Sequence, residues 1–349
     1  MHMSDALMTP AVGGVMWGAT AVATVYCAKK VREDLDESKI PLMGVAGAFV
    51  FAAQMLNFSI PGTGSSGHIG GGLLLAALLG PYAAFLVIAS VLGVQALFFA
   101  DGGLLALGAN IFNLGFFPAF IAFPLAYRKI VGDAPTRSRI VTGSITAAVF
   151  GLLLGALGVV LQTTTSGIAE LPFAAFAALM LPIHLAIGVV EGLVTAGVVL
   201  FVYQAQPEIL ARSANGRTLS GLRMRPVVVG LIVAALVSGG AFAWFASPDP
   251  DGLEWAIEGI AGTDEIKGAS AGTHERAGAL QERLSFLPNY GFHEGDAGAV
   301  AGGEGESGPL VDLGTTVAGI VGAVITLGAV ALIGVVLRRR SASKTAGNS

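Results

Sequence analysis

The chain has 349 residues, of which 54% are hydrophobic and only 12% are charged. A soluble protein of this length would carry roughly twice that share of charge, so the composition excludes an ordinary soluble domain and predicts a bundle of transmembrane helices. The net charge of −4 excludes little, because the position of charges matters more than their sum in a membrane protein. Cys27 is the single cysteine, which excludes an intrachain disulfide and a cluster of metal-binding thiolates.

The beginning of the chain is not typical of a signal peptide. It reads Met1, His2, Met3, Ser4, Asp5, and its first basic residue is Lys29. A cleavable signal peptide would open with Lys or Arg before its apolar core. We therefore expect the N-terminus to be mature as written.

The apolar runs predict an all-α polytopic membrane protein, with about seven transmembrane helices followed by a two-helix C-terminal module. We predict spans near residues 9–29, 41–58, 70–80, 82–100, 104–127, 140–162, 172–203, 226–246 and 313–337. The segment 70–80 is short, so we expect a broken or re-entrant helix that protein or a cavity surrounds. Residues 247–312 are rich in Gly, Ala, Asp and Glu, and we expect a soluble, partly disordered loop there.

Clusters of basic residues predict the orientation in the membrane. Lys29, Lys30 and Arg32 follow the first span, and Arg338, Arg339 and Arg340 follow the last. Between the fifth and sixth spans lie Arg128, Lys129, Arg137 and Arg139. Between the seventh and eighth lie Arg212, Arg217, Arg223 and Arg225. The positive-inside rule makes all of them cytoplasmic. The N-terminus and residues 59–69 and 247–312 are then external, which places His2 and His68 on the same side.

A free N-terminus followed by His2 offers three nitrogen ligands for a metal ion. These are the amine of Met1, the main-chain amide nitrogen of His2 and its Nδ1, which together close a five-membered and a six-membered chelate ring. Such planar, nitrogen-rich sites suit Ni(II) or Cu(II), and imidazole also suits cobalt. One in-plane position remains, and His68 could fill it from the glycine-rich stretch 62–72.

At these residues the sequence resembles the CbiM/NikM family, the substrate-specific component of energy-coupling-factor transporters for cobalt and nickel. The resemblance covers roughly residues 1–205. It rests on the Met1-His2 start, Gly47-Ala48-Phe49, the Gly-Ser-Ser-Gly-His68 loop, residues 95–104, Leu107 to Asn110 and His184 to Gly192. It implies that Met1, His2 and His68 hold the metal.

The C-terminal part resembles the small accessory subunit of the same systems, CbiN/NikN, fused to the chain through the motif Pro250-Asp251-Gly252-Leu253-Glu254. We therefore predict a metal-binding membrane component at 1–205, a cytoplasmic linker at 206–225, a two-helix accessory module at 226–340 with its external loop at 247–312, and a cytoplasmic tail at 341–349. The sequence does not indicate what the accessory module contributes mechanically.

The resemblance implies a cargo-binding subunit and not an enzyme. The chain would capture Ni²⁺ or Co²⁺ in a prokaryotic plasma membrane, in keeping with a role in supplying cobalamin biosynthesis. It has no nucleotide-binding signature, so ATP hydrolysis would fall to CbiO/NikO-like ATPase subunits, joined through a CbiQ/NikQ-like transmembrane coupling subunit. We expect the chain to contact the lipid bilayer and to bind no nucleic acid.

Polar residues in or near the spans are further candidates, because burying them in lipid is costly. Asp101, and less strongly Gln95 and Asn110, could orient a metal-binding histidine from outside the coordination sphere. His184 and Glu191 share one helix face, where a structural polar contact competes with a proton relay.

Two alternatives stay open at this point. A membrane metalloenzyme would need an open coordination position and a nearby general base, which a planar four-nitrogen site does not offer. Cobalt could replace nickel as the cargo; planar nitrogen coordination and Asp101, where cobalt-type relatives more often have His, lean towards nickel.

Overall fold

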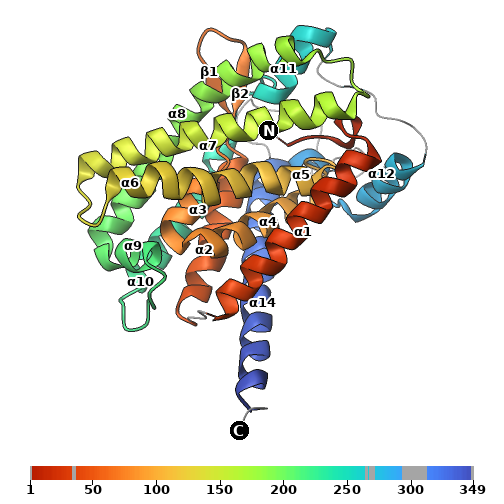
Figure 1. The fold of residues 1–349 in the computed structure, drawn as a ribbon. Helices are drawn as coiled ribbons and strands as arrows, with labels where there is room; N and C mark the ends of the chain where they lie inside the picture. Colours follow the sequence, from red (N-terminus) through yellow and green to blue (C-terminus); the bar gives the residue numbers. More distant parts are fainter. Residues whose placement is uncertain (1, 34–36, 264–265, 267–271, 293–312, 347–349) are drawn as a thin grey trace, which may run out of the picture.

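The computed structural model describes residues 2–33, 37–263, 266, 272–292 and 313–346, and Figure 1 shows it as a bundle of helices. The N-terminal part contains α1 (Pro10–Glu33), α2 (Lys39–Gln54), strands β1 (Phe58–Ile60) and β2 (Ser65–Gly67), α3 (Gly72–Leu79) and α4 (Pro81–Phe98). It continues through α5 (Leu107–Ile111), η2 (Phe112–Tyr127), α6 (Arg128–Val131), α7 (Arg137–Ser166), α8 (Phe173–Ala205) and α9 (Pro207–Ala214).

The C-terminal part contains α10 (Arg225–Gly240), the 3₁₀ turn η3 (Phe242–Phe245), α11 (Gly252–Ala261), α12 (Thr273–Leu284), the short turn η4 (Pro288–Tyr290) and α14 (Leu313–Ala346). In Figure 1 the hairpin and α11 lie at one end of the molecule, and the C-terminus lies at the other. We call the first of these ends the His68 end.

The prediction of an all-α polytopic membrane protein is confirmed. Among the described residues, six helices are long and apolar enough to cross a membrane: α1, α4, the continuous stretch Leu107–Val131, α7, α8 and Gly314–Arg338. Two further apolar helices, α2 and α10, are shorter. Within the stretch Leu107–Val131, the π-helical η2 accommodates Pro118 and Pro124, which lack the N–H of a regular helix.

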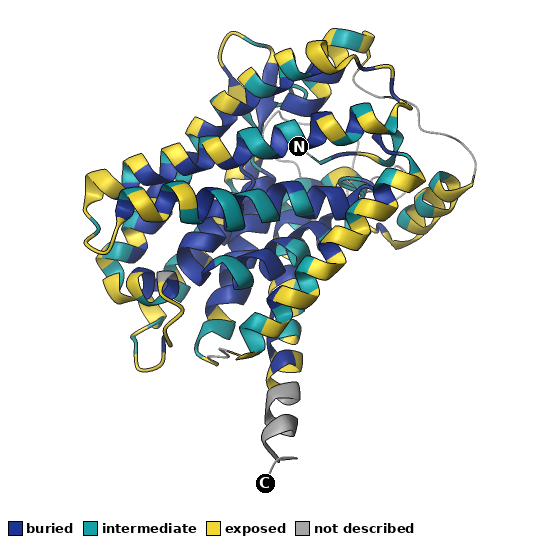
Figure 2. Cartoon of the chain, in the orientation of Figure 1, coloured by how far each residue is buried: buried dark blue, intermediate teal, exposed yellow. Residues whose placement is uncertain are grey.

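The outer helix faces carry apolar side chains that no protein covers. Val15, Val22 and Val25 on α1 are 70%, 71% and 70% exposed, and Figure 2 shows the same pattern along the outside of the bundle. Large exposed apolar surfaces are unusual in water-soluble proteins. Here they are the surfaces that lipid covers.

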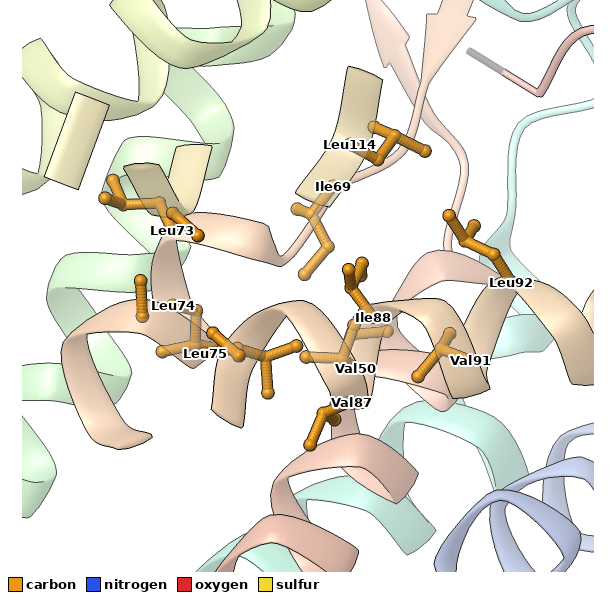
Figure 3. Close-up of a cluster of buried hydrophobic side chains, with 14 of the residues drawn as sticks. Val50, Ile69, Leu73, Leu74, Leu75, Val87, Ile88, Val91, Leu92 and Leu114 are labelled. Carbon is orange, nitrogen blue, oxygen red and sulfur yellow. The ribbon is translucent and has the colours of Figure 1, made fainter. Parts of the chain in front are cut away.

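Helix α3 lies in the centre of the bundle. All of its residues from Gly72 to Leu79 are buried, and Figure 3 shows Leu73, Leu74 and Leu75 packed among Val50 of α2 and Val87 of α4. The predicted short segment at 70–80 is thus a broken helix surrounded by protein, where its free helix ends can find partners.

The connecting segments contain regular structure that was not predicted. Within residues 59–69, β1 and β2 pair in an antiparallel hairpin with Ser59 opposite Ser66. The described residues of the predicted loop 247–312 include α11, α12 and η4. Helix α11 begins where Asp251 and Glu254 complete a capping box, which satisfies donors that a helix start leaves free. Residues 293–312 of the predicted loop lie outside the described residues.

Candidate metal site

The segment that follows His2 is held in place by its main chain. The amide of Met3 donates to Asn110 Oδ1 at 2.9 Å, and Asn110 Nδ2 donates back to the carbonyl of Met3 at 3.1 Å. The amide of Gly103 donates to the same carbonyl at 2.9 Å. Asn110, a predicted supporting residue, therefore acts on the chain beside His2 and not on the imidazole itself.

Asp5, which the sequence analysis did not single out, fastens the same segment. Its Oδ1 accepts from the amide of Ala106 at 3.0 Å. A Cβ on Gly103 would overlap Asp5 Oδ1, at 1.9 Å, so only glycine allows this close approach. Burial raises the pKa of Asp5, although hydrogen bonds from the backbone of Ala106 and Leu105 oppose that rise.

Asp101 contacts His2 directly. The Oδ1 of Asp101 lies 3.0 Å from Nδ1 of His2, and its Oδ2 accepts a hydrogen bond from the hydroxyl of Tyr290 at 2.5 Å. The preceding residue, Ala100, has a φ of +54°, a conformation that costs energy in a residue with a side chain and that bends the chain before Asp101. Burial by itself would raise the pKa of Asp101, but His2 and the Tyr290 hydroxyl hold it below its ordinary value.

Gln95, the third predicted supporting residue, acts through its main chain. It is fully buried, and its carbonyl accepts from the amides of Phe99 and Asp101 at 3.0 and 3.2 Å. It therefore helps to shape the turn that carries Asp101.

His68 follows strand β2 and rests on helix α8. A Cβ on Gly67 would lie 2.5 Å from Ile187 Cγ1, so the loop fits against α8 only without a side chain at this position. The carboxylate of Glu191 accepts from the amides of Gly70 and Gly71 at 2.8 and 3.1 Å. A negative charge suits this place, because these amides lead into the N-terminus of α3.

Of the two buried polar residues on α8, Glu191 makes the structural contact just described. The Nδ1 of His184 donates to the carbonyl of Met180 at 2.8 Å, and its Cε1 would be 3.3 Å from a Cβ on Gly252. His184 therefore lies beneath the start of α11. These contacts favour the structural interpretation of both residues over a proton relay.

The structure brings the two predicted histidines together. The imidazoles of His2 and His68 stack with their centroids 4.9 Å apart and their planes 11° from parallel. Both side chains are buried, at 8% and 7% exposed. The Nε2 of His2 is buried and makes no hydrogen bond within the described part of the chain.

The predicted chelate uses Nδ1 of His2, and this is the nitrogen that lies 3.0 Å from Oδ1 of Asp101. Met1, the first predicted ligand, lies outside the described residues. Within those residues, no three His, Cys, Asp or Glu side chains are grouped to hold an ion, so a site here would need main-chain nitrogens as well.

The sequence analysis missed a contact between the two parts of the chain. The Oδ2 of Asp251, in the Pro-Asp-Gly-Leu-Glu motif, lies 3.3 Å from Nε2 of His68. Burial alone would raise the pKa of Asp251, but His68 contributes to holding it well below its ordinary value. The Pro-Asp-Gly-Leu-Glu motif identified Asp251 as a residue of interest, but its sequence does not indicate a contact with His68.

A cavity of about 390 Å³ lies between these groups. Its polar lining comes from both parts of the chain: His2, His68, Asp101, Asp251, Glu254 and Tyr290. Imidazoles and carboxylates are the side chains that bind divalent transition metals. Fold and site together define a multi-pass membrane protein with a cavity lined by imidazoles and carboxylates at one end of its bundle.

Comparison with known proteins agrees with that class. Residues 2–209 match the family described as the cobalt uptake substrate-specific transmembrane region, and residues 225–339 match the PDGLE domain. The chain belongs to this cobalt uptake family, joined to a PDGLE domain.

Its relatives are transport proteins. A putative fused nickel transport protein NikMN of Archaeoglobus fulgidus is 31% identical over 94% of this chain and 96% of its own length. The fused nickel transport protein NikMN of Rhodobacter capsulatus is 32% identical over 80% of this chain and 83% of its own. A cobalt transport protein CbiM of Sorangium cellulosum is 31% identical over 61% of this chain and 95% of its own.

Among solved structures, a transition metal transporter is 30% identical, with a TM-score of 0.53, covering 61% of this chain and 97% of its own. A truncated transition metal transporter is also 30% identical, with a TM-score of 0.52 over 59% of this chain and 99% of its own. These relatives place the chain among transport proteins and not among enzymes.

Proposed function

We propose that this chain is the cargo-capture component of an ATP-driven importer of the energy-coupling-factor type, and that its cargo is Ni²⁺ or Co²⁺. The ion is held by the amine of Met1, the amide and imidazole nitrogens of His2, and Nε2 of His68. The stacking of His2 and His68 at 4.9 Å carries this proposal, because residues far apart in the sequence meet in one buried place.

The rest of the importer follows from what the chain lacks and from its family. ATP is hydrolysed by partner ATPase subunits, and a transmembrane coupling subunit transmits the resulting movement. The His68 end faces the outside of a prokaryotic plasma membrane. The basic clusters between and after the helices support this orientation, since such clusters stay in the cytoplasm. Residues 1–205 form the capture component, 206–225 the cytoplasmic linker, 226–340 the accessory module and 341–349 the cytoplasmic tail.

Nickel is the favoured cargo. The relatives that align with 94% and 80% of this chain are nickel transport proteins by name, and a plane of four nitrogens suits low-spin Ni(II). Metal analysis and a visible spectrum of the purified chain distinguish the two ions: a yellow, diamagnetic species indicates planar nickel, and a paramagnetic cobalt species would assign cobalt.

Blocking the amine of Met1 tests the ligand set. An N-terminal extension of a few residues removes the free amine. We expect it to abolish tight binding of Ni²⁺, measured by equilibrium titration of purified protein. A chain extended in the same way at its C-terminus is the control. Unchanged affinity of the N-terminally extended chain would show that the amine is no ligand.

A further inference from the structure

The accessory module is attached directly to the hairpin that carries His68. The amide of Ser66 donates to the carbonyl of Pro250 at 2.8 Å, and Ser66 Oγ donates to the carbonyl of Asp249 at 2.7 Å. The indole Nε1 of Trp255 donates to the carbonyl of Thr63 at 3.1 Å. Position 251 is therefore fixed relative to the strand that leads to His68.

The carboxylate of Asp251 contacts both α11 and His68. Its Oδ1 caps the helix by accepting from the amide of Leu253, while Oδ2 lies 3.3 Å from His68 Nε2. Two donors that each lie about 2.1 Å from one ion, at 90–110° to each other, are about 3.0–3.4 Å apart. Oδ2 and Nε2 form an ion pair in this structure, and their separation of 3.3 Å also lies within the range for two ligands of one metal ion.

The cavity in front of this pair attracts cations. Three carboxylates line it, those of Asp101, Asp251 and Glu254. Clefts lined by one sign of charge concentrate ions of the opposite sign and accelerate their binding. The side chain of Asp251 is 15% exposed against 7% for His68, so the carboxylate is the more accessible of the two donors. His2 also lines this cavity, and its buried Nε2 makes no hydrogen bond within the described part of the chain.

We propose that Asp251 and His68 form a loading station, at which a hydrated divalent transition-metal ion is held before it passes to the nitrogen chelate of the N-terminus. This inference rests on the proposed function and gives the accessory module a task in it. One water leaves the ion as Oδ2 of Asp251 coordinates it. The lone pair of His68 Nε2 then replaces a second water, and any proton on that nitrogen leaves to solvent.

The ion then exchanges Asp251 for the nitrogens of the first two residues, while His68 remains bound throughout. Asp251 accordingly controls how fast the ion is loaded and not how firmly it is finally held. With two protein donors, the station uses water for the remaining positions, in keeping with the lack of a group of three ligating side chains among the described residues.

Loading kinetics of the whole chain in lipid nanodiscs test this proposal. Ni²⁺ is mixed rapidly with wild type, Asp251→Asn and Asp251→Ser, and the absorbance of the bound metal is followed. Asn and Ser cap helices about as well as Asp, so α11 is retained. The control is Asp249→Asn, which alters a nearby carboxylate that accepts from Ser59 and Ser247.

We expect both Asp251 variants to load about tenfold more slowly, the lower end of what electrostatic focusing contributes. Their release of metal to excess chelator and the spectrum of the loaded protein stay as in wild type. Added salt slows metal loading of wild type more than that of the variants, because it screens the negative charge of Asp251, which the variants lack. Asp249→Asn loads at the wild-type rate.

An unchanged loading rate in both Asp251 variants overturns the proposal. Faster release or a changed spectrum also overturns it, since Asp251 would then belong to the final site. The N-terminally extended chain separates this result from the proposed function. If it binds as tightly as wild type, the ligand set is wrong, whatever Asp251 does. If it loses binding while Asp251→Asn loads normally, only the loading station is wrong.

Discussion

At the scale of single residues, each histidine of the site is matched by one carboxylate. Asp101 faces His2 and is itself held by the hydroxyl of Tyr290, and Asp251 faces His68 while it caps α11. A carboxylate that is fixed by a second contact can fix an imidazole in turn. For Asp101, which supports His2 in the final site, such an outer partner typically changes metal affinity by 10- to 100-fold.

Asp101→Asn should weaken Ni²⁺ binding by about 10- to 100-fold, because the amide keeps the shape of the side chain but loses the charge that supports His2. Tyr290→Phe removes only the hydrogen bond to Asp101 and should have a smaller effect in the same direction. Titration of purified protein measures both. Equal affinity of wild type and Asp101→Asn would contradict a supporting role.

Asn110→Ala should also weaken binding, by about tenfold, because it removes two hydrogen bonds that fix the main chain of Met3, each worth about 0.5–1.5 kcal/mol. The matched control is Asn113→Ala, since Asn113 pairs with Gln162 and does not contact the N-terminal segment. A loss of similar size in both variants would indicate a general effect on the fold.

At the scale of elements, helix α8 supports the loop that carries His68. Ile187 lies against Gly67, and one turn further along the helix Glu191 binds the amides of Gly70 and Gly71. Glu191, one of the two predicted polar residues of α8, thus supports the loop that carries His68.

Gly67→Ala should lower the unfolding free energy by about 1–3 kcal/mol, the usual cost of inserting a methyl group where there is no space. A double-mutant cycle with Ile187→Ala checks the cause, because the alanine at 67 should cost much less once the opposing side chain is gone. Thermal unfolding in detergent measures all four proteins. Strictly additive effects would mean that the clash with Ile187 is not the reason.

Glu191→Gln should destabilise the protein by about 1.5–3 kcal/mol, since hydrogen bonds to a charged acceptor are the stronger kind. Glu170→Gln changes an exposed residue just before α8 and should leave the melting temperature unchanged. If the Glu191→Gln variant has the same melting temperature as wild type, the carboxylate does not hold the His68 loop.

At the scale of the whole molecule, the two family modules are interlocked at the His68 end. Besides the contacts of Asp251, Gln281 of α12 donates to the carbonyls of Ala96 and Gly102 at 2.9 and 2.7 Å, and His274 lies 2.9 Å from the carbonyl of Met8. The accessory module therefore contacts both halves of the candidate site.

The proposed orientation predicts which residues a membrane-impermeant thiol reagent can reach. In a Cys27→Ser background, Glu258→Cys on α11 should be labelled in intact cells, and Asp133→Cys beyond α6 only after permeabilisation. Both native side chains are exposed. Labelling of Asp133→Cys but not of Glu258→Cys in intact cells would indicate the opposite orientation.

The sequence by itself determined the membrane bundle, its approximate spans, the division into two modules and the pairing of His2 with His68, because hydropathy, basic clusters and short motifs are local properties of the chain. Only the tertiary structure decided that residues 65–67 form a strand, that 252–261 and 273–284 form helices, and that Asp251 lies beside His68. Those features depend on contacts between distant segments: Ser66 with Asp249, Gly67 with Ile187, and Tyr290 with Asp101. No local pattern encodes such contacts, since they arise only when the packed helices bring the segments to the same end.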